Sequence, residues 1–129
     1  MKQRILSVAV VVATFALMGA GVAKNVIKYS KGTAIVNTSS ITKGVRGYNG
    51  NTPVKIYISK NKITRIESLP NQETPAVFAR AEELLGKYVG KTVDEASKMK
   101  VDAVSGATYS SKALVKNVQS GLEYYKKNK

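Results

Sequence analysis

Between about residues 26 and 69, the chain consists of short runs in which apolar and polar residues alternate, a pattern typical of strands with one buried face. The clearest run is 53–59, where Val54, Ile56 and Ile58 are predicted to share a face. The predicted strands are 26–29, 33–36, 53–59 and 63–69. Because successive runs are close in sequence, they predict an antiparallel meander.

Turn-forming residues separate these strands. Ser30-Lys31-Gly32 predicts a first hairpin and Lys60-Asn61-Lys62 a second. Between the hairpins, the run 41–48 is interrupted by two glycines and leads to Asn49-Gly50, a strong turn signal. Short connections of this kind favour strands that pair with their sequence neighbours.

Helical signals begin at Thr74-Pro75, where a candidate N-cap precedes proline at the first helical position. The pattern runs to Leu85, just before Gly86. The apolar side of this helix is expected to consist of Ala76, Val77, Ala79, Ala81 and Leu84. A helix with such a side packs on the predicted sheet.

Two more helices are predicted further along the chain. Thr92 and Glu95 fit a capping box that opens a short helix to about Met99, and the apolar residues 101–104 then predict a short strand. A final helix covers about 109–127. Its apolar stripe is Leu114, Val118, Leu122 and Tyr125. The predicted fold class is therefore α+β, with an antiparallel meander in the N-terminal half packed against two or three helices.

The N-terminus has the order of features found in a secretory signal peptide. Lys2 and Arg4 precede an apolar run over 5–18, and small residues over 19–23 allow cleavage after Ala23. The alternative is a retained membrane anchor, because 5–23 approaches the roughly 20 residues that span a bilayer. Either way we expect export, to the periplasm or the outer face of the cytoplasmic membrane, and a single domain over 24–129.

Composition excludes several classes of chemistry. The 129 residues include no Cys, His or Trp, so a disulfide framework, a thiolate nucleophile, a Ser-His-Asp triad and the usual zinc or haem ligands are all impossible. We expect no catalytic residue and no metal site. Any redox activity must therefore come from an organic cofactor.

Charge is distributed unevenly over a chain with a net charge of +13. Residues 24–66 include nine basic side chains and no acidic one, whereas ten basic and eight acidic side chains follow from residue 67. Export, scattered positive charges and the lack of an RNA-binding signature argue against nucleic acid. The remaining partners are an anionic membrane or an acidic protein surface, and a solvated basic exterior is the simpler interpretation.

The segment 102–111 carries the candidate chemistry. Five of its ten residues bear hydroxyl groups, and it precedes and opens the final helix. Unpaired N–H groups at a helix N-terminus favour a phosphate, and Gly106 and Ala107 would allow the backbone to approach closely. The alternative is that these hydroxyl groups only cap the helix.

The same segment resembles the flavinylation motif of the FMN-binding domain family, which includes subunits of sodium-translocating NADH:quinone reductase and Rnf complexes. The resemblance implies that Thr108 receives FMN as a phosphoester, attached by a magnesium-dependent flavin transferase. Asp102, Ser105, Gly106 and Ala107 occupy the matching recognition and phosphate-binding positions.

The resemblance extends over about residues 46–125. Gly47-Tyr48-Asn49-Gly50 and Glu73-Thr74-Pro75 match segments upstream of the motif, and residues 24–45 are expected to form an extra hairpin. Tyr48 and Tyr109 are candidates to stack on the flavin ring, although both could be core residues. Glu73, Thr74 and Ser110 complete the expected cofactor-binding residues, although Glu73 and Thr74 could instead cap the helix.

Three functions remain open at this point. The first is an exported carrier with covalent FMN on Thr108, relaying electrons from a membrane-associated donor to an extracytoplasmic acceptor, and not necessarily an enzyme. The second is a flavin reductase that binds FMN without a covalent bond. The third is a cationic surface-binding protein without a cofactor.

Overall fold

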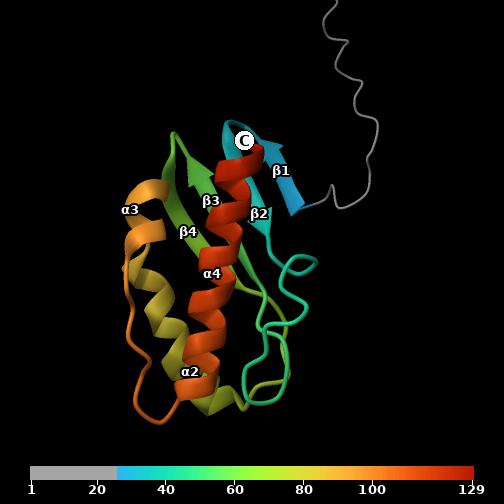
Figure 1. Cartoon of the computed structure of the whole chain (residues 1–129), viewed down its shortest axis with the longest axis vertical. Helices are drawn as coiled ribbons and strands as arrows, with labels where there is room; N and C mark the ends of the chain where they lie inside the picture. Colours follow the sequence, from blue (N-terminus) through green and yellow to red (C-terminus); the bar gives the residue numbers. More distant parts are fainter. Residues whose placement is uncertain (1–25) are drawn as a thin grey trace, which may run out of the picture.

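A four-stranded antiparallel sheet and a layer of helices make up residues 26–129, the part of the chain that the computed structural model describes (Figure 1). The elements in chain order are β1 (Ile27–Ser30), β2 (Thr33–Asn37), β3 (Val54–Ser59), β4 (Lys62–Ser68), α2 (Pro75–Glu82), the 3-10 helix η3 (Glu83–Lys87), α3 (Val93–Lys98) and α4 (Thr108–Asn128). The predicted leader over 1–23 lies outside the described residues. None of the helices within 26–129 is long and apolar enough to cross a membrane.

The sheet confirms the predicted meander, because its strand order is β1-β2-β3-β4 and all pairs are antiparallel. Two-residue turns close both outer hairpins. Lys31 and Gly32 have φ values of 50° and 83°, and Lys60 and Asn61 have φ values of 52° and 63°. Positive φ at both central residues matches the right-handed twist of the flanking strands, so these turns set the strand register.

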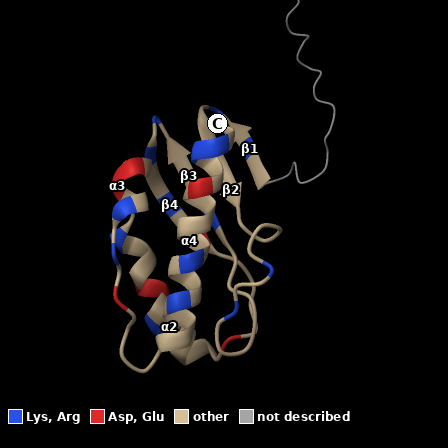
Figure 2. Ribbon diagram, viewed as in Figure 1, with Lys and Arg blue, Asp and Glu red and all other residues tan. Residues whose placement is uncertain are grey.

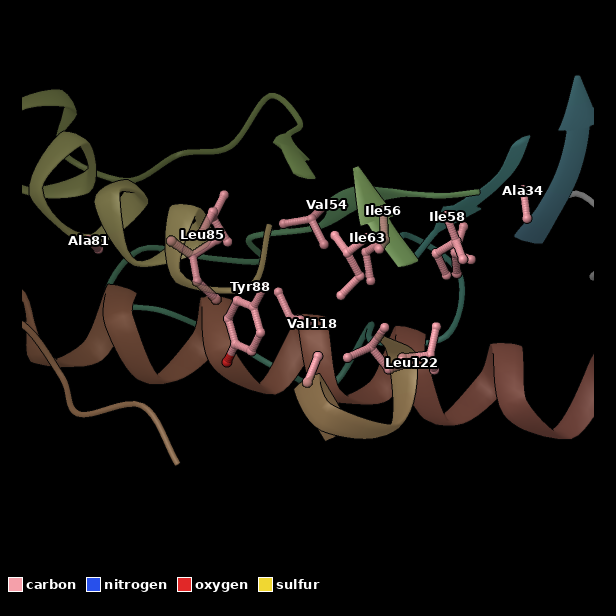
Figure 3. Close-up of a cluster of buried hydrophobic side chains, with 14 of the residues drawn as sticks. Ala34, Val54, Ile56, Ile58, Ile63, Ala81, Leu85, Tyr88, Val118 and Leu122 are labelled. Carbon is pink, nitrogen blue, oxygen red and sulfur yellow. The ribbon is translucent and has the colours of Figure 1, made fainter. Parts of the chain in front are cut away.

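The helices cover one face of the sheet, with α4 running along its length (Figure 1). Val54, Ile56 and Ile58 of β3 are buried on that face, as predicted from their alternation. Leu114, Val118 and Leu122 of α4 are fully buried, which confirms the predicted stripe. Figure 3 shows Val118 and Leu122 with Leu85 and Tyr88 between the two layers.

The extra hairpin expected over 24–45 is part of this core. Val26, Ala34 and Val36 are buried in the same cluster, and β2 pairs along its whole length with β3. Residues 38–53 then form a loop with a single bridge between Arg46 and Asn51, so the turn predicted at Asn49-Gly50 is present. The first hairpin is therefore an integral part of the sheet and of its core.

A buried polar cluster fixes this loop to α4. The side-chain carbonyl oxygen of Asn117, a residue with no exposed surface, accepts from the hydroxyl groups of Thr38 at 2.7 Å and Thr42 at 2.5 Å. Its Nδ2 donates to Thr52 Oγ1 at 3.3 Å and to the Ala113 carbonyl at 3.0 Å. All three threonines are buried, so their hydroxyl groups must find partners inside the protein, and Asn117 is a partner of each.

The capping box predicted at Thr92 and Glu95 is confirmed, and so is the short helix that it opens. The strand predicted over 101–104 is wrong, because these residues have no regular structure. After α3 the chain returns along the helical layer (Figure 1), away from any strand that could pair with it. Val101 and Val104 still pack against the core, which explains their apolar character.

The helix predicted from Thr74 differs in its buried side. Ala76 and Ala79 are exposed, whereas Phe78, Ala81, Leu84 and Leu85 are buried. The helical path also continues past Gly86 as η3, and this tighter winding rotates Leu84 and Leu85 toward the sheet. The bulky phenylalanine, which buries more apolar area than alanine, thus decides the orientation of α2.

The packing of α4 on the sheet requires glycine at position 121. A Cβ atom there would lie 2.7 Å from Ile56 Cδ1 and 2.9 Å from Thr38 Cγ2. We expect Gly121→Ala to lower the free energy of unfolding by about 1–2 kcal/mol, although alanine favours helix by about 1 kcal/mol. Gly86→Ala is the control, since a Cβ at Gly86 meets nothing within 4 Å. Denaturant unfolding that found the two variants equally stable would contradict this packing.

Candidate functional site

A pocket of about 280 Å³ opens where three chain segments meet: the loop around residue 48, the start of α2 and the start of α4. Its lining residues are Tyr48, Glu73, Thr74, Val77, Gly106, Ala107, Thr108, Tyr109 and Ser110. Pro75 at the first position of α2 and the turn at Gly106 define where the two helices begin. The pocket therefore lies at one end of the helical layer.

Glu73 connects all three segments. Its carboxylate accepts hydrogen bonds from the backbone N–H groups of Tyr48 at 2.8 Å and Asn49 at 2.5 Å, and from the Ser110 hydroxyl at 2.5 Å. Its own N–H donates to Asn71 Oδ1 at 3.0 Å. A Cβ at Gly47 would overlap the Glu73 carboxylate, so glycine lets the loop close around it.

The environment of Glu73 has opposing effects on its pKa. Burial raises the pKa, because only 6% of the residue is exposed. Hydrogen bonds from Ser110 and from the backbone of Asn49, Tyr48 and Gly50 lower it and outweigh burial, so the pKa lies below its usual value. The carboxylate is therefore ionised at neutral pH and acts as a structural acceptor.

The start of α4 offers unpaired donors to the pocket. Its first backbone hydrogen bond runs from the Ser111 N–H to the Ala107 carbonyl at 2.9 Å, so the N–H groups of Thr108, Tyr109 and Ser110 precede the helical ladder. No side chain caps this end, and its first turn contains no acidic residue. Within the described part of the chain, this end therefore resembles an anion site and not a capped terminus.

Gly106 shapes the approach to this helix. Its φ of 84° lies in the left-handed region, and a Cβ there would come within 2.8 Å of Arg80 Nη2. The same Arg80 atom donates to the Ser105 carbonyl at 2.8 Å. The guanidinium group of α2 thus fixes the turn that leads into Thr108 and adds positive charge beside it.

Two exposed tyrosines stand at the mouth of the pocket. Tyr48 is 74% exposed and Tyr109 is 64% exposed, and their ring centroids are 6.0 Å apart at an interplanar angle of 42°. Neither is the core residue that the alternative interpretation required. Large aromatic rings exposed beside a pocket are available to contact a planar ligand.

Most of the predicted cofactor-binding residues come together here, although the sequence places them far apart. Asp102 and Ser105 do not line the pocket; Asp102 is exposed and has no side-chain hydrogen bond to the described residues. Thr74 lies at the N-cap position but makes no capping hydrogen bond. Sequence reasoning did not assign Val77 or Arg80 to the site. The only signal for them was their position in the helix predicted to begin after Thr74.

Comparison with known proteins gives one family match. A family model of the FMN-binding domain matches residues 47–123, which is more than half of the chain and includes every residue that lines the pocket. The curated proteins contain no match to this sequence.

Glu73→Gln should destabilise the protein around the pocket. The carboxylate accepts hydrogen bonds through two oxygens, whereas an amide accepts through its single oxygen and its NH2 group would face a donor. We expect a loss of about 1–3 kcal/mol in the free energy of unfolding at neutral pH. The folded-state pKa is lowered, so the advantage of the unchanged protein is complete above about pH 5 and shrinks as pH falls through the folded-state pKa. Denaturant unfolding across this range measures the difference.

Glu83→Gln is the matched control, because Glu83 is exposed at the start of η3. It should change stability by less than about 0.5 kcal/mol at any pH. An equal loss in both variants, or a Glu73→Gln loss that grows as pH falls, would contradict the role assigned to the carboxylate.

Proposed function

Because the chain belongs to the FMN-binding domain family, we propose that it is an exported electron carrier with FMN joined to Thr108 by a phosphoester bond. FMN is the cofactor of this family, and when bound it supplies the electron transfer that this chain, without thiols or imidazoles, lacks. The protein's part is to hold the cofactor and to control what reaches it.

The observation that carries the proposal is the position of Thr108. It is the first residue of α4, it lines the pocket, and it is exposed. Its hydroxyl has no hydrogen-bond partner among residues 26–129 and is therefore available as an acceptor of the phosphoryl group. In the proposed attachment step, Oγ1 attacks the flavin-bearing phosphorus of a phosphoanhydride donor held by a flavin transferase. The Oγ1–P bond forms as the phosphoanhydride P–O bond breaks, the rest of the donor leaves as a phosphate monoester, and the hydroxyl proton passes to solvent.

The surroundings of Thr108 suit a phosphate. Three N–H groups at the start of α4 precede the helical ladder, and Arg80 contributes a positive charge to the adjoining turn. Glycine at 106 keeps this turn free of a side chain. The phosphodiester would retain one negative charge, which the helix N-terminus stabilises.

The pocket also suits a ring that remains partly in contact with solvent. Its volume of about 280 Å³ lies just below the roughly 300–1,000 Å³ of typical ligand sites, as expected for a pocket that encloses only part of the cofactor. Tyr48, Tyr109 and Val77 offer apolar surface to the ring, and the open side leaves an edge for electron exchange. Because the pocket encloses the cofactor only partly, a covalent bond would prevent its loss.

The proposal also includes export and redox partners. The basic and apolar order of residues 2–18 supports secretion or retention at the outer face of the cytoplasmic membrane. The proposed donor is a membrane-associated reductase and the proposed acceptor is extracytoplasmic. A flavin transferase acting on 102–111 completes maturation.

The attachment site can be tested by coexpressing the protein with a flavin transferase and imaging a denaturing gel for flavin fluorescence. The unchanged protein should give a fluorescent band, because the ester survives unfolding. Thr108→Val should abolish the band, since it retains the shape of threonine without the hydroxyl. Thr108→Ser should retain a band, because a primary hydroxyl can form the same ester.

Two results would contradict the proposal. A fluorescent band from Thr108→Val would show that the flavin is attached to another residue. No band from the unchanged protein, together with flavin released on unfolding, would favour noncovalent FMN. Intact-mass measurement of each variant checks both outcomes.

A further inference from the structure

Lysines gather at the end of the molecule opposite the pocket. Both hairpin turns and the end of α4 lie there, and blue marks each of them in Figure 2. We call this surface the lysine end; its members are Lys31, Lys60, Lys62, Lys91, Lys126, Lys127 and Lys129. All seven side chains are exposed, and they come from four separate parts of the chain.

Acidic residues compensate this charge only in part. Asp94 lies 3.8 Å from Lys126, and Glu95 is engaged in the capping box, where it accepts from the Thr92 N–H at 2.9 Å. Glu123 is the remaining acidic residue near the end of α4. Seven lysines against three carboxylates leave the lysine end strongly positive.

The hairpin tips present lysine where other residues are favoured. Lys31 and Lys60 both have positive φ, a conformation that glycine and asparagine adopt at lower cost. Two independent turns at the same end thus carry lysine in the left-handed region. Since local folding does not require lysine at these positions, a role outside the fold accounts for it better.

The location of the lysine end argues against a redox partner. The 21 residues of α4 separate it from the pocket by roughly 30 Å, and a potential in 0.1 M salt is screened within about 10 Å. Electron transfer falls steeply with distance, so a partner bound at the lysine end would be badly placed to exchange electrons with a group in the pocket.

The residue types argue for a membrane and against a protein. The lysine end contains no arginine, whereas Arg46, Arg65 and Arg80 lie elsewhere. Protein interfaces are enriched in arginine and depleted in lysine, because a planar guanidinium makes directed bonds. Flexible lysines attract a diffuse layer of negative charge, as lipid head groups present.

We propose that the lysine end docks on an anionic lipid surface, with the hairpin tips at Lys31 and Lys60 leading. Tyr29, which is 65% exposed two residues before the first tip, contributes the amphipathic ring that suits the boundary between head groups and water. In this orientation the pocket faces away from the membrane. Docking requires neither FMN nor the ester at Thr108.

The test is binding of the full chain to vesicles of phosphatidylglycerol and phosphatidylcholine, compared with vesicles of phosphatidylcholine alone. The apolar run over 5–18 can bind both, so the measured quantity is the ratio of the two partition coefficients. We expect a ratio well above one that falls as salt rises. The triple variant K31Q/K60Q/K62Q should reduce it by about 100-fold, because each lysine at an anionic surface contributes roughly fivefold.

The matched control is K43Q/K112Q/K116Q, which removes the same charge from the loop after β2 and the first half of α4. Its ratio should fall by less than about 10-fold, because these lysines would lie beyond the screening length from the membrane. Equal losses in the two variants would show a general effect of charge and overturn the proposal. A second result would also overturn it: K31Q/K60Q/K62Q leaves the ratio of partition coefficients unchanged but is no longer retained on immobilised polyglutamate. This result would indicate an acidic protein partner.

Salt dependence of the unchanged protein provides a measurement that needs no variant. A ratio that stays constant between about 50 and 300 mM salt would exclude electrostatic docking. A steep fall would support it even if a triple variant failed to fold. Both measurements are independent of cofactor loading.

Discussion

The pocket exists because a buried carboxylate needs hydrogen-bond donors. An ionised Glu73 without partners would be strongly destabilising, so the loop around residue 48 and the start of α4 must supply N–H and O–H groups to it. The same bonds bring Tyr48 and Tyr109 together at the mouth of the pocket, with their ring centroids 6.0 Å apart. Sequence reasoning assigned this carboxylate to the cofactor or to a helix cap, and the structure shows that it also organises the walls of the site.

Helix α4 connects the pocket to the sheet and to the opposite end of the molecule. It starts at the pocket, crosses the sheet in close contact at Gly121, and ends among the lysines. Asn117, in its middle, holds the loop that continues toward Tyr48. The hairpin of β1 and β2 lies before the family match, yet Val26, Ala34 and Val36 complete the core under α4. The core beneath the site therefore includes residues that lie outside the family match.

Local rules predicted the elements well, and tertiary contacts explain what they missed. Alternation in β3, the turn residues at Lys31 and Lys60, and the capping box at Thr92 each act over a few residues, so the sequence reveals them. The run 101–104 has strand-forming residues but no partner strand within reach, and propensity alone cannot detect this. Motif resemblance identified most of the pocket lining. The contact of Arg80 with Ser105 joins α2 to the turn before α4, and no local pattern encodes it.

The family match establishes FMN as the cofactor, and the geometry around Thr108 makes this residue the proposed point of attachment. Trypsin cleaves after lysine, and Lys100 and Lys112 flank the peptide 101–112 that contains the motif. The most direct measurement is therefore fragmentation mass spectrometry of this peptide from protein coexpressed with a flavin transferase. We expect a mass increase of FMN less one water on Thr108. Flavin on a serine or Tyr109 of the same peptide, or on a different peptide, would contradict it.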